Sequence, residues 1–243
     1  MTLSEVVAEI KREDRETAEL VIYRNGEELN FSVRKTTVEI ISVEEKMLDD
    51  EIGYIEVTQF IENTDELFLE AVDNLSKKNM KSLIIDLRDN GGGLVDSCVN
   101  MLSRFVPEGE LITYTEDKNK QRVEYKSRSK ETLPIPVILL VNGNSASASE
   151  IFVGCMKDYG YAKTVGTKTY GKGIVQSVIP LSDGSAVKFT VSKYYTPKGE
   201  NIHETGFEPD IEVEMTDEEK AEARKDEKKD KQLKEAIRQL KTQ

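Results

Sequence analysis

The sequence of 243 residues contains one histidine, His203, and two cysteines, Cys98 and Cys155. So few imidazole and thiol groups exclude zinc sites built on two or three histidines. A Ser-His-Asp triad would have to use His203 alone, so a nucleophilic enzyme with this composition is expected to take another residue as its base. The two cysteines are interpreted as small, buried, apolar side chains.

Long hydrophobic runs are also missing. The longest purely aliphatic run is Val137 to Val141, far short of the ~20 residues that a membrane helix needs. Met1 is not followed by the basic and then apolar segment of a secretion signal. With 34 basic and 46 acidic side chains, the net charge is −12, which argues against nucleic acid as a partner. The length predicts one full domain plus smaller pieces.

The first 35 residues predict a helix followed by a hairpin. Leu3, Val6, Val7 and Ile10 have the spacing of one apolar helix face. Two alternating runs, 18–23 and 29–33, flank a dipeptide, Asn25-Gly26, that favours a tight hairpin turn. This segment is too short for a core of its own. Residues 36–50 are interpreted as a linker.

Strands and helices alternate over residues 51–215 and predict an α/β core with both faces of its sheet covered. Strands are expected at 52–60, 82–87, 136–141, 163–166, 174–179 and 186–195, and helices after Asn63, at 94–105 and at 147–158. Asn63 and Glu66 have capping-box spacing. Residues 107–133 predict two exposed strands. The charged segment 216–243 predicts a solvated helix whose apolar trio, Leu233, Ile237 and Leu240, docks on the body.

The cluster Asn144-Ser-Ala-Ser-Ala-Ser-Glu150 follows a buried strand and opens a helix. Ser147 and Glu150 match a capping box, which by itself is a purely structural explanation. The same position also suits a nucleophile, because an oxyanion formed by attack of Ser147 would lie beside the unpaired amides of a helix N-terminus.

Gly166-Thr-Lys-Thr-Tyr-Gly-Lys172-Gly173 resembles a phosphate-binding loop except at its last position, where glycine replaces the hydroxyl residue that would bind magnesium. The residues that follow are β-branched and end in proline, which predicts a strand and not the required helix. Nucleotide binding is therefore disfavoured. The glycines on both sides of Lys172 would let the backbone pack closely.

Gly91, Gly92 and Gly93 follow a buried strand. They are explained equally well by a flexible turn or by a loop that brings backbone amides to a reacting carbonyl. His203 lies in a polar segment after Pro197 and is expected to be an ordinary surface residue.

Together these segments resemble the carboxyl-terminal processing peptidases, the tail-specific serine proteases. The matching motifs run in family order from about Glu51 to Val213: Gly53-Tyr-Ile-Glu-Val, Leu83-Ile-Ile-Asp-Leu-Arg-Asp-Asn-Gly-Gly-Gly, Val141-Asn-Gly-Asn-Ser-Ala-Ser-Ala-Ser-Glu-Ile, Val165-Gly-Thr-Lys-Thr-Tyr-Gly-Lys-Gly and Gly206-Phe-Glu-Pro-Asp. The resemblance implies a crotonase-like, ClpP-like α/β peptidase core that uses a serine nucleophile and a lysine base.

The resemblance also implies roles for individual residues. Ser147 matches the nucleophile, Lys172 the base and Gln176 the residue that orients the lysine. The oxyanion hole would combine an amide of the loop Gly91, Gly92, Gly93 with the amide of Ala148. In a regular strand Lys172 and Gln176 lie ~13 Å apart, so a direct hydrogen bond needs a bend, which we expect at Gly173.

The front of the chain departs from the family pattern, because residues 3–33 look like only the last helix and hairpin of a PDZ domain. The resemblance implies protein or peptide substrates with extended C-terminal tails, no metal or other cofactor, and a location in the cell envelope or outside the cytoplasm. It leaves homo-oligomer formation open. We therefore expect a serine endopeptidase that cleaves unstructured chain ends through an acyl-enzyme. The alternatives are a non-catalytic peptide-binding or scaffold fragment and a nucleotide hydrolase.

Overall fold

The computed structural model describes residues 2–12, 14–36, 40–49, 51–182 and 184–242. It divides into two compact units, one ending at Ile40 and the other beginning at Ile41. In the first unit, helix α1 (Leu3–Lys11) precedes a hairpin of β1 (Thr17–Arg24) and β2 (Glu27–Arg34). The hairpin turns through Asn25 and Gly26, both at positive φ. The helix and hairpin expected from the sequence are therefore confirmed.

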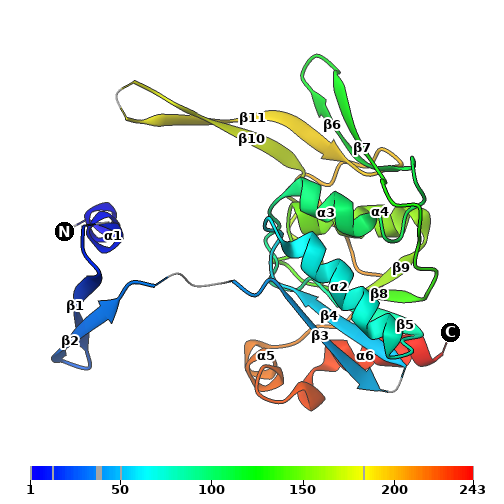
Figure 1. The fold of residues 1–243 in the computed structure, drawn as a ribbon, viewed down its shortest axis with the longest axis horizontal. Helices are drawn as coiled ribbons and strands as arrows, with labels where there is room; N and C mark the ends of the chain where they lie inside the picture. The colour runs from blue at the N-terminus through cyan, green and yellow to red at the C-terminus, as the bar shows by residue number, and fades with distance from the viewer. Residues whose placement is uncertain (1, 13, 37–39, 50, 183, 243) are drawn as a thin grey trace. The chain divides into compact units, whose positions relative to one another are not determined.

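The second unit is built on a six-stranded sheet with the order β12-β9-β8-β5-β4-β3 (Figure 1). From β12 to β4, each strand pairs in parallel with the next in this order. The edge strand β3 pairs antiparallel with β4. The strands are β3 (Val43–Asp49), β4 (Ile52–Val57), β5 (Ser82–Asp86), β8 (Val137–Val141), β9 (Ala162–Gly166) and β12 (Ile211–Glu212).

Strand β3 corrects the expected linker. Val43–Asp49 forms part of the core sheet, so only the residues before it connect the units. Its sequence is mostly charged because one of its faces meets solvent. It therefore lacks the apolar pattern that would predict a strand. Residues 37–39 and 50 of the expected linker lie outside the described residues.

Helices cover both faces of the sheet, as the sequence predicts. One face packs against α2 (Thr64–Lys77), α3 (Val95–Leu102) and α4 (Ala148–Tyr159), where Phe68, Phe105 and Phe152 meet edge-on or tilted. The other face, which includes Ile84 and Leu140, packs against α6 (Lys231–Lys241).

The C-terminal segment is therefore not simply a solvated tail. It forms α5 (Asp217–Ala223), a 3-10 turn η1 (Glu227–Lys229) and α6, the orange and red elements of Figure 1. Leu233 and Leu240 are buried against the sheet and Ile237 is partly buried. The predicted docking of this trio is confirmed.

A second, antiparallel sheet has the order β10-β11-β6-β7. Its strands are β6 (Leu111–Asp117), β7 (Arg122–Lys126), β10 (Ile174–Pro180) and β11 (Ala186–Tyr195), and the β10–β11 hairpin projects from the body (Figure 1). The prediction that both strands of 107–133 are exposed was wrong for β6, which is mostly buried because β11 pairs with it and α4 contacts it. None of the described helices is long and apolar enough to cross a bilayer.

One predicted helix start was also wrong in detail. Asn63 makes no capping hydrogen bond at the start of α2. Its φ of −107° and ψ of 5° differ from the extended backbone of a typical N-cap. The buried hydroxyl of the next residue, Thr64, accepts from the backbone amide of Ile61 at 3.0 Å, which ties the helix start to the segment before it.

Candidate active site

Three serines in alternate positions lie where β8 gives way to α4, and they have different environments. Ser145 and Ser149 are fully buried. The Ser145 hydroxyl donates to the Leu87 carbonyl at 2.7 Å and the Ser149 hydroxyl to the Asn90 carbonyl at 2.8 Å. Both carbonyls lie just before the glycine loop, residues 91–93. Ser147 is half-buried and has φ 57° and ψ −114°. Residues other than glycine rarely adopt positive φ, and such backbone strain gathers at functional sites. Ser147 is therefore the serine that this turn presents.

A single buried carboxylate connects Ser147 to the segment that carries Lys172. Glu150 is fully buried, and its Oε2 accepts from the backbone amides of Ser147 at 3.0 Å and Lys172 at 2.8 Å. Its Oε1 accepts from the Thr169 hydroxyl at 2.6 Å and the Gly171 amide at 2.7 Å. The capping explanation therefore covers only one of these four bonds, because the other three reach a different loop.

Lys172 is half-buried in the loop between β9 and β10, and the backbone on its far side is tightly packed. A Cβ added at Gly173 would lie 2.7 Å from the backbone nitrogen of His203. The Gly173 carbonyl also accepts from the Tyr194 amide at 2.9 Å. Glycine is required at this close approach, and the packing fixes the loop from which the Lys172 side chain extends.

His203 is not the ordinary surface residue that the sequence suggests. Its side chain is half-buried, and its Nδ1 is buried without a hydrogen-bond partner among the described residues. The backbone of His203 also packs onto Gly173, an approach that no sequence pattern indicates.

The glycine loop lies directly against the serine turn. Asn90 is fully buried; its Nδ2 donates to the Val57 carbonyl at 2.7 Å, and its Oδ1 accepts from the Gly92 amide at 2.9 Å. Gly92 has φ 97°, and a Cβ there would lie 2.8 Å from the Cβ of Ser147 and 2.9 Å from the nitrogen of Ala148. The approach is possible only because residue 92 has no side chain.

The backbone amides near Ser147 differ in their availability. The amide of Gly92 is already bonded to Asn90. Within the described part of the chain, the amides of Gly91, Gly93 and Ala148 have no internal acceptor. Ala148 is the first residue of α4, where amides are unpaired because no preceding helical turn supplies carbonyls.

Gln176 lies on β10, where it pairs with Thr190 of β11. It is exposed, and its side chain has no hydrogen bond to any described residue. A bend was expected at Gly173, whereas the irregularity of β10 is a shift in its pairing with β11 between Val175 and Gln176. The side chains of Ser147, Lys172 and Gln176 are likewise not joined by a hydrogen bond within the described residues. β10 follows Gly173 where a phosphate-binding loop would need a helix, so the architecture contradicts the nucleotide alternative.

Sequence reasoning gave no role to Asn90 or Thr169 and only a capping role to Glu150. One available signal was Glu150 itself, since an acidic residue directly precedes the apolar run Ile151, Phe152, Val153. A carboxylate on the buried face of a helix needs several donors, and these had to come from another segment.

The sequence profile of peptidase family S41 matches residues 51–213, more than half of the chain. This chain belongs to peptidase family S41. The resemblance to the carboxyl-terminal processing peptidases is confirmed by two curated relatives. A probable CtpA-like serine protease of Staphylococcus epidermidis is 36% identical over 87% of this chain and 43% of the relative. The carboxy-terminal processing protease CtpA of Bacillus subtilis is 34% identical over 89% of this chain and 47% of the relative.

Solved structures agree with the α/β peptidase fold. The photosystem II D1 C-terminal processing protease has a TM-score of 0.67 at 30% identity, covering 82% of this chain and 55% of that protein. A putative S41 protease of Bacteroides fragilis has a TM-score of 0.70 at 16% identity, covering 93% of this chain and 65% of that one, which supports the fold alone. The chain spans less than half the length of the two curated relatives.

Proposed function

We propose that this chain carries the catalytic site of a serine endopeptidase in which Ser147 is the nucleophile and Lys172 the base. The observation that carries the proposal is the contrast among the three serines. Ser147 alone is half-buried and at positive φ, and the Glu150 carboxylate bonds its amide and that of Lys172. Membership of family S41 supports the same reaction class.

In the proposed mechanism, the neutral amine of Lys172 accepts the proton of the Ser147 hydroxyl as its oxygen attacks the scissile carbonyl. A lysine acts in this way only when its amine is uncharged. The amide of Ala148, with that of Gly93 or Gly91, stabilises the oxyanion. Lysine then protonates the leaving amine, and water hydrolyses the acyl-enzyme.

The substrates proposed are proteins with extended, unstructured C-terminal regions. Two of the similar proteins are named carboxy-terminal or C-terminal processing proteases. Gln176 is proposed to orient Lys172 only after a rearrangement, since it is exposed in the described state.

The test compares hydrolysis of a fluorogenic unstructured peptide by the wild-type chain and by Ser147→Ala and Lys172→Ala. The matched control is Lys168→Ala, which removes an exposed lysine of the same loop that pairs with Glu208. Both site variants are expected to lose activity by at least ~10³-fold, while the control keeps it. Equal hydrolysis by wild type and Ser147→Ala would refute the assignment. Peptide binding without any turnover would favour the scaffold alternative.

A further inference from the structure

The residues just before the glycine loop are held by the C-terminal segment. Strand β5 ends at Asp86, and Arg88 follows two residues later. The Arg88 guanidinium donates to Asp86 Oδ2 at 2.5 Å and contacts Asp230 Oδ2 at 2.8 Å. Its Nη1 also donates to Gln232 Oε1 at 3.0 Å. Two of its three partners therefore come from a segment more than 140 positions away.

These charges are well shielded from water. The side chains of Arg88, Asp86 and Asp230 are only 18%, 5% and 8% exposed. Tyr54 adds a hydrogen bond from its hydroxyl to Asp86 at 2.7 Å. Although burial works against the charged form of Arg88, the neighbouring carboxylates Asp86 and Asp230 raise its pKa overall. Because a buried cation depends on its partners, removal of either carboxylate charge is expected to release the arginine.

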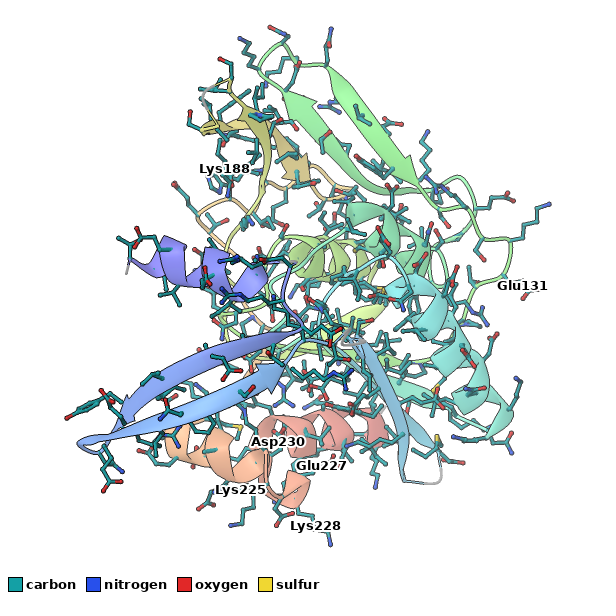
Figure 2. The ribbon with its side chains drawn as sticks, turned by 60° about the vertical axis from the view of Figure 1, so that its left-hand side comes forward. Glu131, Lys188, Lys225, Glu227, Lys228 and Asp230 are labelled. Atoms are coloured by element: carbon teal, nitrogen blue, oxygen red, sulfur yellow. The ribbon has the colours of Figure 1, made fainter. Side chains whose placement is uncertain are left out.

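Asp230 is itself fixed in the fold. It caps α6 by accepting from the Leu233 amide at 2.9 Å, and Figure 2 labels it in the C-terminal segment. Gln232 is held in turn, because its Nε2 donates to the Val213 carbonyl at 2.8 Å. The burial of α6 against the sheet therefore sets the positions of the two C-terminal partners of Arg88, Asp230 and Gln232.

The next residue, Asp89, ties the same loop to the serine turn. It has φ 59°, and its Oδ1 accepts from Asn142 at 3.0 Å and from Asn144 at 2.7 Å. The Asp89 amide donates to Asn142 Oδ1 at 3.0 Å. Arg88 and Asp89 thus anchor one end of a loop whose Gly92 lies against Ser147 and Ala148.

We propose that Asp230 is a positioning residue for the reaction. It holds Arg88, and Arg88 in turn keeps the glycine loop in its contact with Ser147. The inference rests on the proposed function, because it assigns the loop to the oxyanion hole. Loss of the charge at residue 230 would displace the loop amides relative to the Ser147 turn. Displaced oxyanion-hole amides weaken the stabilisation of the transition state more than they weaken the binding of the substrate.

The test is Asp230→Asn, which keeps the helix cap and the shape of the side chain but removes its charge. The expected result is a fall in kcat of roughly tenfold with KM within about twofold. Hydrogen exchange, which needs no catalysis, is expected to speed up in 89–93 and to stay unchanged in α4. The matched control is Glu235→Gln, the same chemical change at a carboxylate of α6 that bonds Arg238 and Gln239.

A second variant, Gln232→Met, is used if Asp230→Asn does not fold. Methionine has a similar length to glutamine but cannot accept the hydrogen bond that Arg88 donates to Gln232. This variant is expected to speed up exchange in 89–93 to a smaller extent. Unchanged kcat and unchanged exchange in 89–93 in a folded variant would overturn the proposal. If the wild-type chain shows no Ser147-dependent cleavage, the proposed function fails, whereas the exchange measurement still reports whether Asp230 holds the loop.

Discussion

The carboxylate of Glu150 accepts a hydrogen bond of 2.8 Å from the backbone amide of Lys172. It also accepts hydrogen bonds from the Ser147 amide, the Thr169 hydroxyl and the Gly171 amide, which makes four donors in all. Only a carboxylate has enough lone pairs to accept all four, since an amide side chain has one oxygen and an NH2 group. The geometry between the serine turn and the lysine loop therefore depends on the charge state and chemistry of this one side chain.

We predict that Glu150→Gln lowers kcat/KM by roughly 10²-fold, because its NH2 group would face at least one amide and push the two loops apart. The measurement is peptide hydrolysis, with melting temperature recorded beside it. A matched change of an exposed glutamate, Glu208→Gln, is expected to leave hydrolysis unaltered. Wild-type kinetics in a folded Glu150→Gln protein would contradict the positioning role.

Gly92→Ala is predicted to abolish measurable hydrolysis. The added methyl group would lie 2.6 Å from the Ala146 carbonyl oxygen and 2.8 Å from the Ser147 Cβ, and alanine also disfavours the φ of 97°. Gly143→Ala is the control, because a Cβ there would meet, among the described residues other than its chain neighbours, just the Lys168 carbonyl at 3.8 Å, and its φ is ordinary. Activity in Gly92→Ala close to that of Gly143→Ala would show that the loop does not contact the reacting centre.

Local patterns predicted most of the helices and strands because their periodicity follows burial directly. The strand Val43–Asp49 was missed since its charged face meets solvent. The capping role of Asn63 failed because its backbone, at φ −107° and ψ 5°, lacks the extended conformation of a typical N-cap. Motifs were enough to propose Ser147 as the nucleophile and Lys172 as the base. The roles of Glu150 and Asn90 could not be proposed in this way, because each depends on a buried side chain reaching a segment that is distant in sequence.

His203→Gln is predicted to keep kcat/KM within a few-fold of wild type. The backbone of His203 supports Gly173, and a substitution of the side chain leaves that contact in place. Glutamine also suits a half-buried position with an unpaired nitrogen. Steady-state hydrolysis beside Lys172→Ala is the measurement. A loss as large as that of Lys172→Ala would mean that the imidazole, and not the lysine, is the base.

Glu56→Gln is predicted to raise the melting temperature at neutral pH. Burial, with the nearby charge of Asp86, raises the pKa of Glu56 above its ordinary value of 4.5. A carboxyl with a raised pKa binds its proton more tightly in the folded state, so stability falls as pH rises from that ordinary value through the folded pKa. The increase in melting temperature from Glu56→Gln is therefore expected to be present near pH ~8 and to vanish near pH ~4. A loss of stability at the higher pH would contradict this assignment.

Leu233→Ala is predicted to lower the free energy of unfolding by about 2–5 kcal/mol, because it removes a buried side chain between α6 and the sheet. Leu233 is 3% exposed and packs in the cluster that includes Ile84 and Leu140. Denaturant unfolding provides the measurement, and the exposed neighbour Lys234→Ala is expected to change stability by less than ~0.5 kcal/mol. If both variants unfold at the same denaturant concentration, α6 does not belong to the folding core. A large loss for Leu233→Ala alone would mean that the segment carrying Asp230 is part of the same cooperative unit as the strand that leads into the glycine loop.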